Sequence, residues 1–159
     1  MKTHDLDVFD LKILDRLQMD NRTSLSEIGK AVNLSAAAVQ RRVRRMEDAK
    51  IIQANVAVVD PRAVGRPITL IVEVQLDSER ADILDAARNE FASVPEVQQC
   101  YYVTGASDFI LIITVTSMEE CATLSRRLFL ENLNVKHFST NVAMSRVKVS
   151  LRVPVEHGI

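Results

Sequence analysis

The sequence predicts an α+β chain in two parts, three helices followed by a four-stranded sheet with two helices. Apolar residues recur at helical spacing as far as about residue 48, whereas four stretches from residue 68 onward are typical of strands. Between the helical part and the strand-rich part lie two turn signals, Asp60-Pro61 and Gly65-Arg66-Pro67. We therefore expect one domain over residues 1–50, a strand or linker over 51–66, and a second domain over 67–159.

The first two helices are predicted from spacing and from capping residues. The first spans 7–20, where these residues lie at near-helical spacing: Val8, Leu11, Leu14 and Leu17. Ser24 followed by Glu27 is a capping-box pattern, which opens a short second helix. Its inward residues are expected to be Ile28, Ala31 and Val32.

A third helix follows after a tight turn. Asn33 tolerates a left-handed backbone, and Ser35 can cap a helix that runs to about Asp48. One apolar stripe runs along this helix: Val39, Val43 and Met46. A second and third helix joined in this way make a helix-turn-helix.

The rest of the chain has the order β-α-β-β-α-β. Four stretches are interpreted as strands, over 68–76, 97–103, 109–115 and 138–144, and helical spacing appears over 79–92 and 118–131. This order is the split βαβ, or ferredoxin-like, arrangement. Both helices then lie on one face of the sheet and leave the other face bare, so we expect at least a dimer.

Composition narrows the class of protein. Residues of the AVILMFWYC class make up 47% of the chain and charged residues 26%, as in folded soluble proteins. The longest apolar run, from Phe109 to Ile113, is far shorter than the roughly 18 residues of a membrane span. No apolar stretch follows the N-terminus, so a secretory signal is not expected, and two cysteines make no disulfide framework or zinc site. We expect a cytoplasmic protein with no metal, no cofactor and no membrane partner.

Charge is distributed unevenly. The formal net charge is −1, but residues 30–50 form a basic island of Lys30, Arg41, Arg42, Arg44, Arg45 and Lys50 against Glu47 and Asp48. Such an island is typical of a localised phosphate contact, and its alternative is a solvated helix face. Nothing indicates an enzyme, because the four glycines are dispersed and neither G-x-S-x-G nor H-E-x-x-H occurs.

A resemblance to a known family can now be stated. The run from Leu34 to Glu47, Leu-Ser-Ala-Ala-Ala-Val-Gln-Arg-Arg-Val-Arg-Arg-Met-Glu, followed by Ile51-Ile52, resembles the recognition helix of the Lrp/AsnC family, the feast/famine regulators. The opening from Leu6 to Leu17 and the glycine-plus-aspartate loop from Val103 to Phe109 are also similar to that family. The likeness covers about residues 6–148. It implies a winged-type helix-turn-helix followed by a ferredoxin-like (RAM/ACT-like) domain for effector binding and oligomerisation.

The third helix supplies the candidate DNA-binding residues. The N-terminal part of a recognition helix enters the major groove, and phosphate contacts flank it. We expect base contacts from Ser35, Ala37, Gln40 and Arg41, and phosphate contacts from Arg42, Arg44 and Arg45. One of these arginines could instead pair with Glu47 or Asp48 of the same helix. The related family often has prolines at or near the start of this helix, where this chain has alanines, so a base preference is not implied.

The loop between the second and third strands supplies the candidate effector site. Backbone N–H groups around Gly105 and the Thr104 hydroxyl suit a carboxylate, and Asp108 suits an ammonium group. By resemblance this loop lies near the family's amino-acid pocket at a subunit interface, to which Thr140 could contribute. The alternative is an ordinary turn.

These observations predict a sequence-specific DNA-binding transcriptional regulator whose assembly and DNA affinity respond to an amino acid. The expected partners are double-stranded DNA, an amino acid and further copies of the chain, as a dimer, an octamer or another ring of dimers. Two alternatives stay open: an architectural DNA-wrapping protein without a small-molecule response, and a metabolic binding module without a DNA role.

Overall fold

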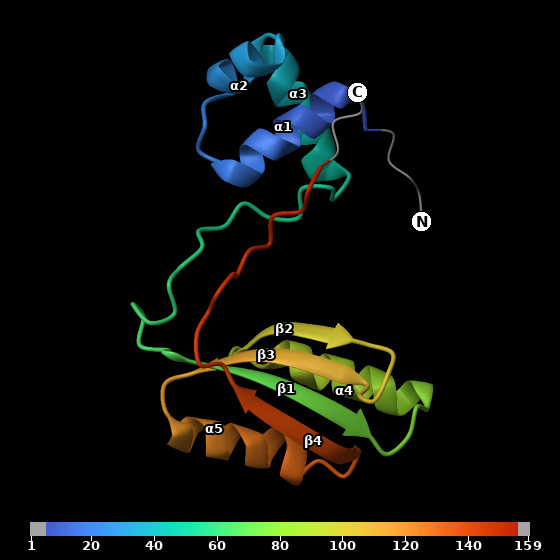
Figure 1. Ribbon diagram of the computed structural model, residues 1–159. Helices are drawn as coiled ribbons and strands as arrows, with labels where there is room; N and C mark the ends of the chain where they lie inside the picture. The colour runs from blue at the N-terminus through green and yellow to red at the C-terminus, as the bar shows by residue number, and fades with distance from the viewer. Residues whose placement is uncertain (1–5, 156–159) are drawn as a thin grey trace. The chain divides into compact units, whose positions relative to one another are not determined.

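The computed structural model describes residues 6–155, so the outer limits of the two expected domains lie outside it. Two compact units are present: residues up to Ala57 together with those from Lys148 onward, and Val58–Val147 (Figure 1). The second domain was expected to continue to residue 159, whereas in the structure residues 148–155 pack with the helical unit. Among the described residues, no helix is long and apolar enough to cross a membrane.

The helical unit contains the three predicted helices, α1 (Val8–Met19), α2 (Leu25–Val32) and α3 (Ala36–Asp48). The predicted Ser24–Glu27 capping box is present at the start of α2. The core of the unit is a small apolar cluster formed by Ile13, Ile28, Val32, Val39 and Met46. The three helices therefore share one apolar centre, as the helix-turn-helix prediction requires.

The turn between α2 and α3 depends on two special residues. Asn33 has φ 57° and ψ 44°, the left-handed conformation predicted for it. Gly29 in α2 is buried, and a Cβ placed there would lie 2.5 Å from the carbonyl oxygen of Leu34. Ala31, expected inside, is exposed. The inward side of α2 includes Gly29 because the turn packs back onto the helix at this position, which hydropathy alone does not indicate.

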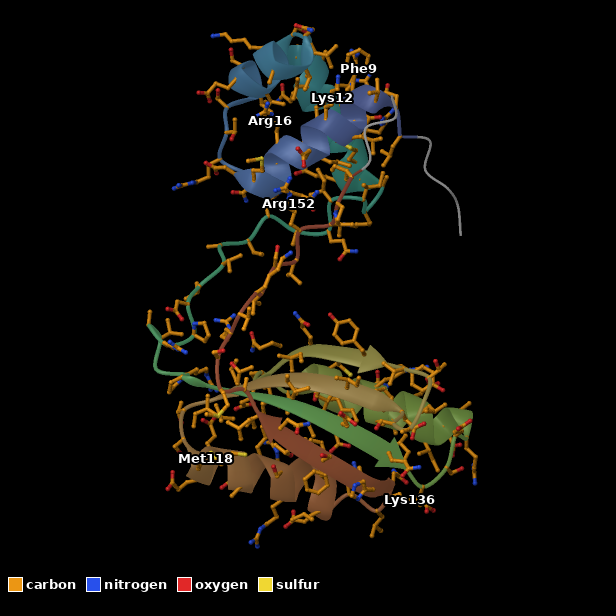
Figure 2. The ribbon with its side chains drawn as sticks, viewed as in Figure 1. Phe9, Lys12, Arg16, Met118, Lys136 and Arg152 are labelled. Atoms are coloured by element: carbon orange, nitrogen blue, oxygen red, sulfur yellow. The ribbon has the colours of Figure 1, made fainter. Side chains whose placement is uncertain are left out.

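Residues 148–155 run along α1 in the helical unit. The Gln18 side chain pairs with both backbone groups of Val153: its Nε2 donates to the carbonyl oxygen over 3.0 Å, and its Oε1 accepts from the N–H over 2.7 Å. Arg152 Nη2 donates to Asp15 Oδ1 over 2.6 Å, and Figure 2 labels Arg152 beside α1. We call residues 148–155 the C-terminal segment.

The segment after α3, for which a strand or a linker was expected, forms no strand. Residues 53–60 have no regular secondary structure, and Val56, Val58 and Val59 are exposed. A β-branched run favours extended backbone, but a strand also needs a neighbouring strand to accept its hydrogen bonds. The described part of the chain supplies no such neighbour for this segment.

The second unit has the predicted βαββαβ order. Its elements are β1 (Ile68–Leu76), α4 (Ala81–Ser93), β2 (Val97–Tyr102), β3 (Phe109–Val115), α5 (Met118–Ser125), which continues into the π-helical turn η1 (Arg126–Leu130), and β4 (Val135–Val142). The strands lie in the order β2-β3-β1-β4, and each neighbouring pair is antiparallel (Figure 1). This is the ferredoxin-like arrangement.

Strand register separates the two faces of the sheet. Alternate residues of β1 are buried from Leu70 to Leu76, in one core with residues of α4, α5 and η1. Tyr102 lies opposite Phe109 on this covered face, and the Arg88 guanidinium of α4 lies 4.8 Å from the Tyr102 ring centroid. The neighbouring Tyr101 therefore lies on the open face, where its side chain is 50% exposed. Both helices cover the same face, as predicted, and the other face is bare within this chain.

Candidate functional sites

The exposed face of α3 carries most of the predicted DNA-binding residues. The Ser35 hydroxyl caps the helix by accepting a hydrogen bond from the N–H of Ala38 over 3.2 Å. The exposed residues Ala37, Gln40, Arg41 and Arg44 follow at helical spacing. Neither Arg41 nor Arg44 makes a hydrogen bond or ion pair with the described residues. This face can therefore present an amide and two guanidinium groups to a ligand.

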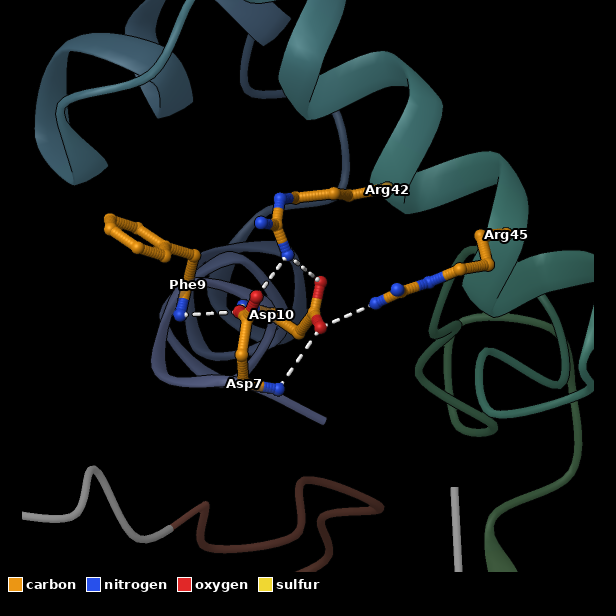
Figure 3. A network of polar contacts seen from close by, with 5 residues as sticks. All are labelled: Asp7, Phe9, Asp10, Arg42 and Arg45. Atoms are coloured by element: carbon orange, nitrogen blue, oxygen red, sulfur yellow. Dashed lines mark hydrogen bonds and ion pairs between the residues drawn. The ribbon is translucent and has the colours of Figure 1, made fainter. Parts of the chain in front are cut away.

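Arg42 and Arg45 are engaged differently, through a buried carboxylate of α1 (Figure 3). Arg42 Nη1 donates to Asp10 Oδ1 over 2.9 Å and to Asp7 Oδ2 over 2.7 Å. Arg45 Nη2 donates to Asp10 Oδ2, and Asp10 itself is fully buried. We call Asp7, Asp10, Arg42 and Arg45 the Asp10 cluster.

An arginine of this helix was considered as a partner for Glu47 or Asp48 within α3. In the described residues, the acids that pair with the α3 arginines come from α1. Glu47 Oε1 instead accepts a hydrogen bond from Asn55 Nδ2 over 3.0 Å. The periodicity of α1 carried a signal that was missed, because Asp10 lies three residues before the buried Ile13, on the inward side of the helix.

Both ends of the Asp7–Arg42 pair are electrostatically perturbed. The backbone N–H of Asp10 donates to the Asp7 carboxylate, and this bond, together with the Arg42 guanidinium, holds the pKa of Asp7 below its usual value. The Asp10 and Asp7 carboxylates raise the pKa of Arg42. The Arg42 guanidinium also lies 5.5 Å from the centroid of the Phe9 ring. The charged forms are therefore the stable ones, and the cluster fixes α3 against α1.

The predicted effector loop is exposed at its tip and anchored at its base. Thr104, Gly105 and Ala106 are exposed, and Gly105 has φ 138°, a backbone conformation that favours glycine. Asp108 is the anchor: its N–H donates to the carbonyl oxygen of Val74 over 2.9 Å, and its Oδ2 accepts from the N–H of Leu76 over 2.7 Å. One oxygen of the predicted ammonium-binding carboxylate is thus used to hold the loop to β1.

Thr140 is not brought together with this loop. It lies opposite Val72 in the β1–β4 register, on the face that the helices cover. Its hydroxyl oxygen is buried without a hydrogen-bond partner. Alternation along β4 directs its side chain toward the core, away from the open face of the sheet.

Two family models match the chain. The AsnC-type helix-turn-helix domain matches residues 6–47, and the Lrp/AsnC ligand binding domain matches residues 69–153.

Relatives and solved structures agree with these matches. The chain is 45% identical over 152 residues to an uncharacterized HTH-type transcriptional regulator of Sinorhizobium fredii, covering 96% of this chain and 90% of the relative. It is 32% identical to the leucine-responsive regulatory protein of Escherichia coli, covering 96% and 93%. A crystal structure of a transcriptional regulator from Neisseria meningitidis in complex with L-Met superposes with a TM-score of 0.87 at 26% identity, covering 96% of this chain and 98% of that one.

The helix-turn-helix unit and the βαββαβ unit together define a transcriptional regulator with a DNA-binding domain and a ligand-binding domain. The chain belongs to the Lrp/AsnC family.

Proposed function

We propose that this regulator binds specific DNA sites as a dimer or as a ring of dimers, and that an amino acid changes its assembly and its DNA affinity. The exposed face of α3 carries this proposal, because Ala37, Gln40, Arg41 and Arg44 project from a helix that buried contacts fix in place. A fixed helix lets short side chains meet base edges at a defined register.

The chemistry of this face supports discrimination between bases. The Gln40 amide can pair bidentately with adenine, the Arg41 guanidinium can pair with guanine, and the Ala37 methyl group can touch a thymine methyl. Arg44 adds a positive charge that suits a phosphate. Each good bidentate pair discriminates against a wrong base by about 1–3 kcal/mol. One helix-turn-helix domain, or head, contacts few base pairs, so the specificity requires two heads on a symmetric site.

Self-association is supported by the apolar surface that the single chain leaves open. Ile71 and Tyr101 are exposed on the bare face of the sheet, with Ile110 and Ile112 half-buried beside them. The extended segment that includes Val56 and Val58 is also exposed. The neighbouring apolar side chains on the open sheet face are of the kind that marks an interface between proteins. A second copy of the chain covers it in our proposal, and light scattering in solution measures the resulting mass.

The amino-acid site is proposed at the loop of Thr104, Gly105 and Asp108. Exposed backbone N–H groups and the Thr104 hydroxyl suit a carboxylate, and Asp108 has a second oxygen with no hydrogen-bond partner among the described residues. The relative from Neisseria meningitidis is seen in complex with L-Met. That observation concerns the relative, and it supports an amino acid as the class of effector here.

Two measurements test the proposal. Selection of bound duplexes from a random pool should enrich a symmetric site that binds at least about 1,000-fold more tightly than random DNA at physiological salt. A ratio near one would favour the architectural alternative. Thermal unfolding against the twenty amino acids should then show a shift for one or a few of them. A ligand at about 100 times its dissociation constant adds roughly 2.7 kcal/mol to stability, and no shift with any of the twenty would refute the effector proposal.

A further inference from the structure

A small cleft lies beside α3, at the flank of the face that reads DNA in our proposal. It has a volume of about 190 Å³ and is lined by Arg41, Arg42 and Arg45. Arg42 and Arg45 belong to the Asp10 cluster, in which one terminal nitrogen of Arg42 reaches both Asp7 and Asp10 and one terminal nitrogen of Arg45 reaches Asp10. A guanidinium carries five N–H donors, so both side chains keep donors that these carboxylates do not use.

The side chains around the cleft are graded from buried to exposed. Asp10 is 0% exposed, Arg42 is 22% exposed, and Arg45 is 55% exposed. Arg45 therefore has one part bound to a buried anion and the other part open to solvent. Arg41 has no hydrogen-bond or ion-pair partner among the described residues and lies one helical turn before Arg45.

The charge of the site favours an anion. Three arginine residues line the cleft, and together with the two carboxylates of the Asp10 cluster they give a formal charge of +1. Phosphate oxygens match the planar fork of an arginine side chain. Phosphate contacts to a recognition helix lie beside the residues that read bases, and this is the position of the cleft on α3.

We infer that this cleft binds one phosphate group of the DNA backbone, and that Asp10 is the positioning residue that orients Arg45 for it. The inference rests on the proposed DNA-binding function. A free arginine side chain loses rotamer entropy when it binds a phosphate. Because Asp10 already holds Arg45 before DNA binds, less entropy is lost on binding. Asp10 acts through Arg45 and does not itself touch the phosphate.

The direction in which one substitution changes the DNA affinity tests this role. Asp10→Asn and the control Asp7→Asn each remove one negative charge near the same cleft, so simple electrostatics predicts tighter DNA binding for both. The positioning role predicts that Asp10→Asn binds a random duplex about three- to tenfold more weakly than wild type does, while Asp7→Asn does not weaken binding. The slope of log affinity against log salt should also fall by about 0.9 for each head in Asp10→Asn. If Asp10→Asn instead binds as tightly as Asp7→Asn does, the inference is wrong.

A second variant keeps the test decisive if Asp10→Asn does not fold. Arg45→Lys retains the charge and loses the planar fork, so we expect DNA binding to weaken while the salt slope stays close to that of wild type. Arg16→Lys, on the α1 surface labelled in Figure 2, is the control and should bind DNA as wild type does. Equal binding by Arg45→Lys and wild type would overturn the inference. If wild type binds no DNA at all, the proposed function itself fails.

One further arm separates DNA from a free anion. Inorganic phosphate replaces chloride at equal ionic strength, and thermal unfolding is measured for wild type and Arg45→Lys. We expect equal unfolding temperatures in the two salts for both proteins. A phosphate-specific stabilisation of wild type that Arg45→Lys lacks, together with equal DNA binding by the two proteins, would assign the cleft to a free anion and overturn the DNA assignment.

Discussion

Replacing Gly29 with alanine should destabilise the helical unit, although the same change usually stabilises a helix. Alanine is favoured over glycine within a helix by about 1 kcal/mol. Here the new Cβ would lie 2.5 Å from the carbonyl oxygen of Leu34, a distance that real Cβ atoms essentially never show. The obstructing atom is backbone, and the N–H of Leu34 also donates to the Gly29 carbonyl oxygen over 2.9 Å. The turn therefore has to move as a unit.

The magnitude follows from the two opposing effects. Because the obstructing atom is backbone, the overpacking cost lies in the upper part of its usual range, at about 2–3 kcal/mol, and the gain in helix propensity offsets about 1 kcal/mol of it. We expect a net loss of about 1–2 kcal/mol in the free energy of unfolding, measured by urea denaturation. Hydrogen exchange should locate the loss in residues 24–48. Ser26→Ala, at an exposed position of the same helix, is the control and should change stability by less than about 0.5 kcal/mol. A Gly29→Ala protein as stable as wild type would refute the reasoning.

Three other outcomes can be measured on the same protein. Lys50 has φ 59°, a left-handed conformation that glycine adopts without strain. Lys50→Gly should therefore raise the urea midpoint, with a gain of about 1 kcal/mol in the free energy of unfolding, and an unchanged or lower midpoint would contradict this. The pKa of Asp7 is lowered in the folded state, chiefly by the N–H of Asp10, so its contribution to stability is present above the unfolded pKa and is lost as pH falls through the folded pKa. Asp7→Asn should therefore lose less stability than wild type does between pH 5 and about pH 2, as followed by urea denaturation, and equal losses would argue against this assignment. Thr140→Val removes a buried hydroxyl that has no hydrogen-bond partner among the described residues, so the free energy of unfolding should stay unchanged or rise by up to about 1 kcal/mol. The variant should also keep any amino-acid response, and loss of that response would show that Thr140 contributes to the effector site.

Features set by local sequence could be predicted, and features set by tertiary contacts could not. The Ser24–Glu27 capping box and the left-handed Asn33 both depend on a few neighbouring residues, and both are confirmed. The Asp10 cluster joins residues 32 to 35 positions apart, so no local pattern names its partners. For the same reason the sequence predicted four basic residues of α3 as DNA contacts without separating Arg42 and Arg45 from the others.

In the candidate effector site, too, the local features could be predicted and the tertiary contacts could not. The glycine and the aspartate indicated a tight loop, and Gly105 has the positive φ that such a loop uses. The bonds from Asp108 to Val74 and Leu76 depend on the β1–β3 pairing, which sequence alone does not place in register. The face on which Thr140 lies could have been predicted from the sequence, because Thr140 alternates with Phe138 and Val142, and a single hydroxyl in an apolar stripe favours the covered face.

Because the C-terminal segment belongs to the helical unit, the last part of this unit is synthesised much later than its helices. Gln18 and Val153 are separated by 135 positions, so α1 leaves the ribosome long before the backbone that pairs with it. At translation rates of about 5–20 residues per second, the delay is roughly 7 to 27 seconds. During that time the nascent DNA-binding unit lacks the C-terminal segment that lies against α1, although the residues of its apolar core have already been synthesised. A gene fragment that ends after the first 57 residues therefore encodes a helix-turn-helix that never acquires this covering, and its stability should not be equated with that of the same helices in the full chain.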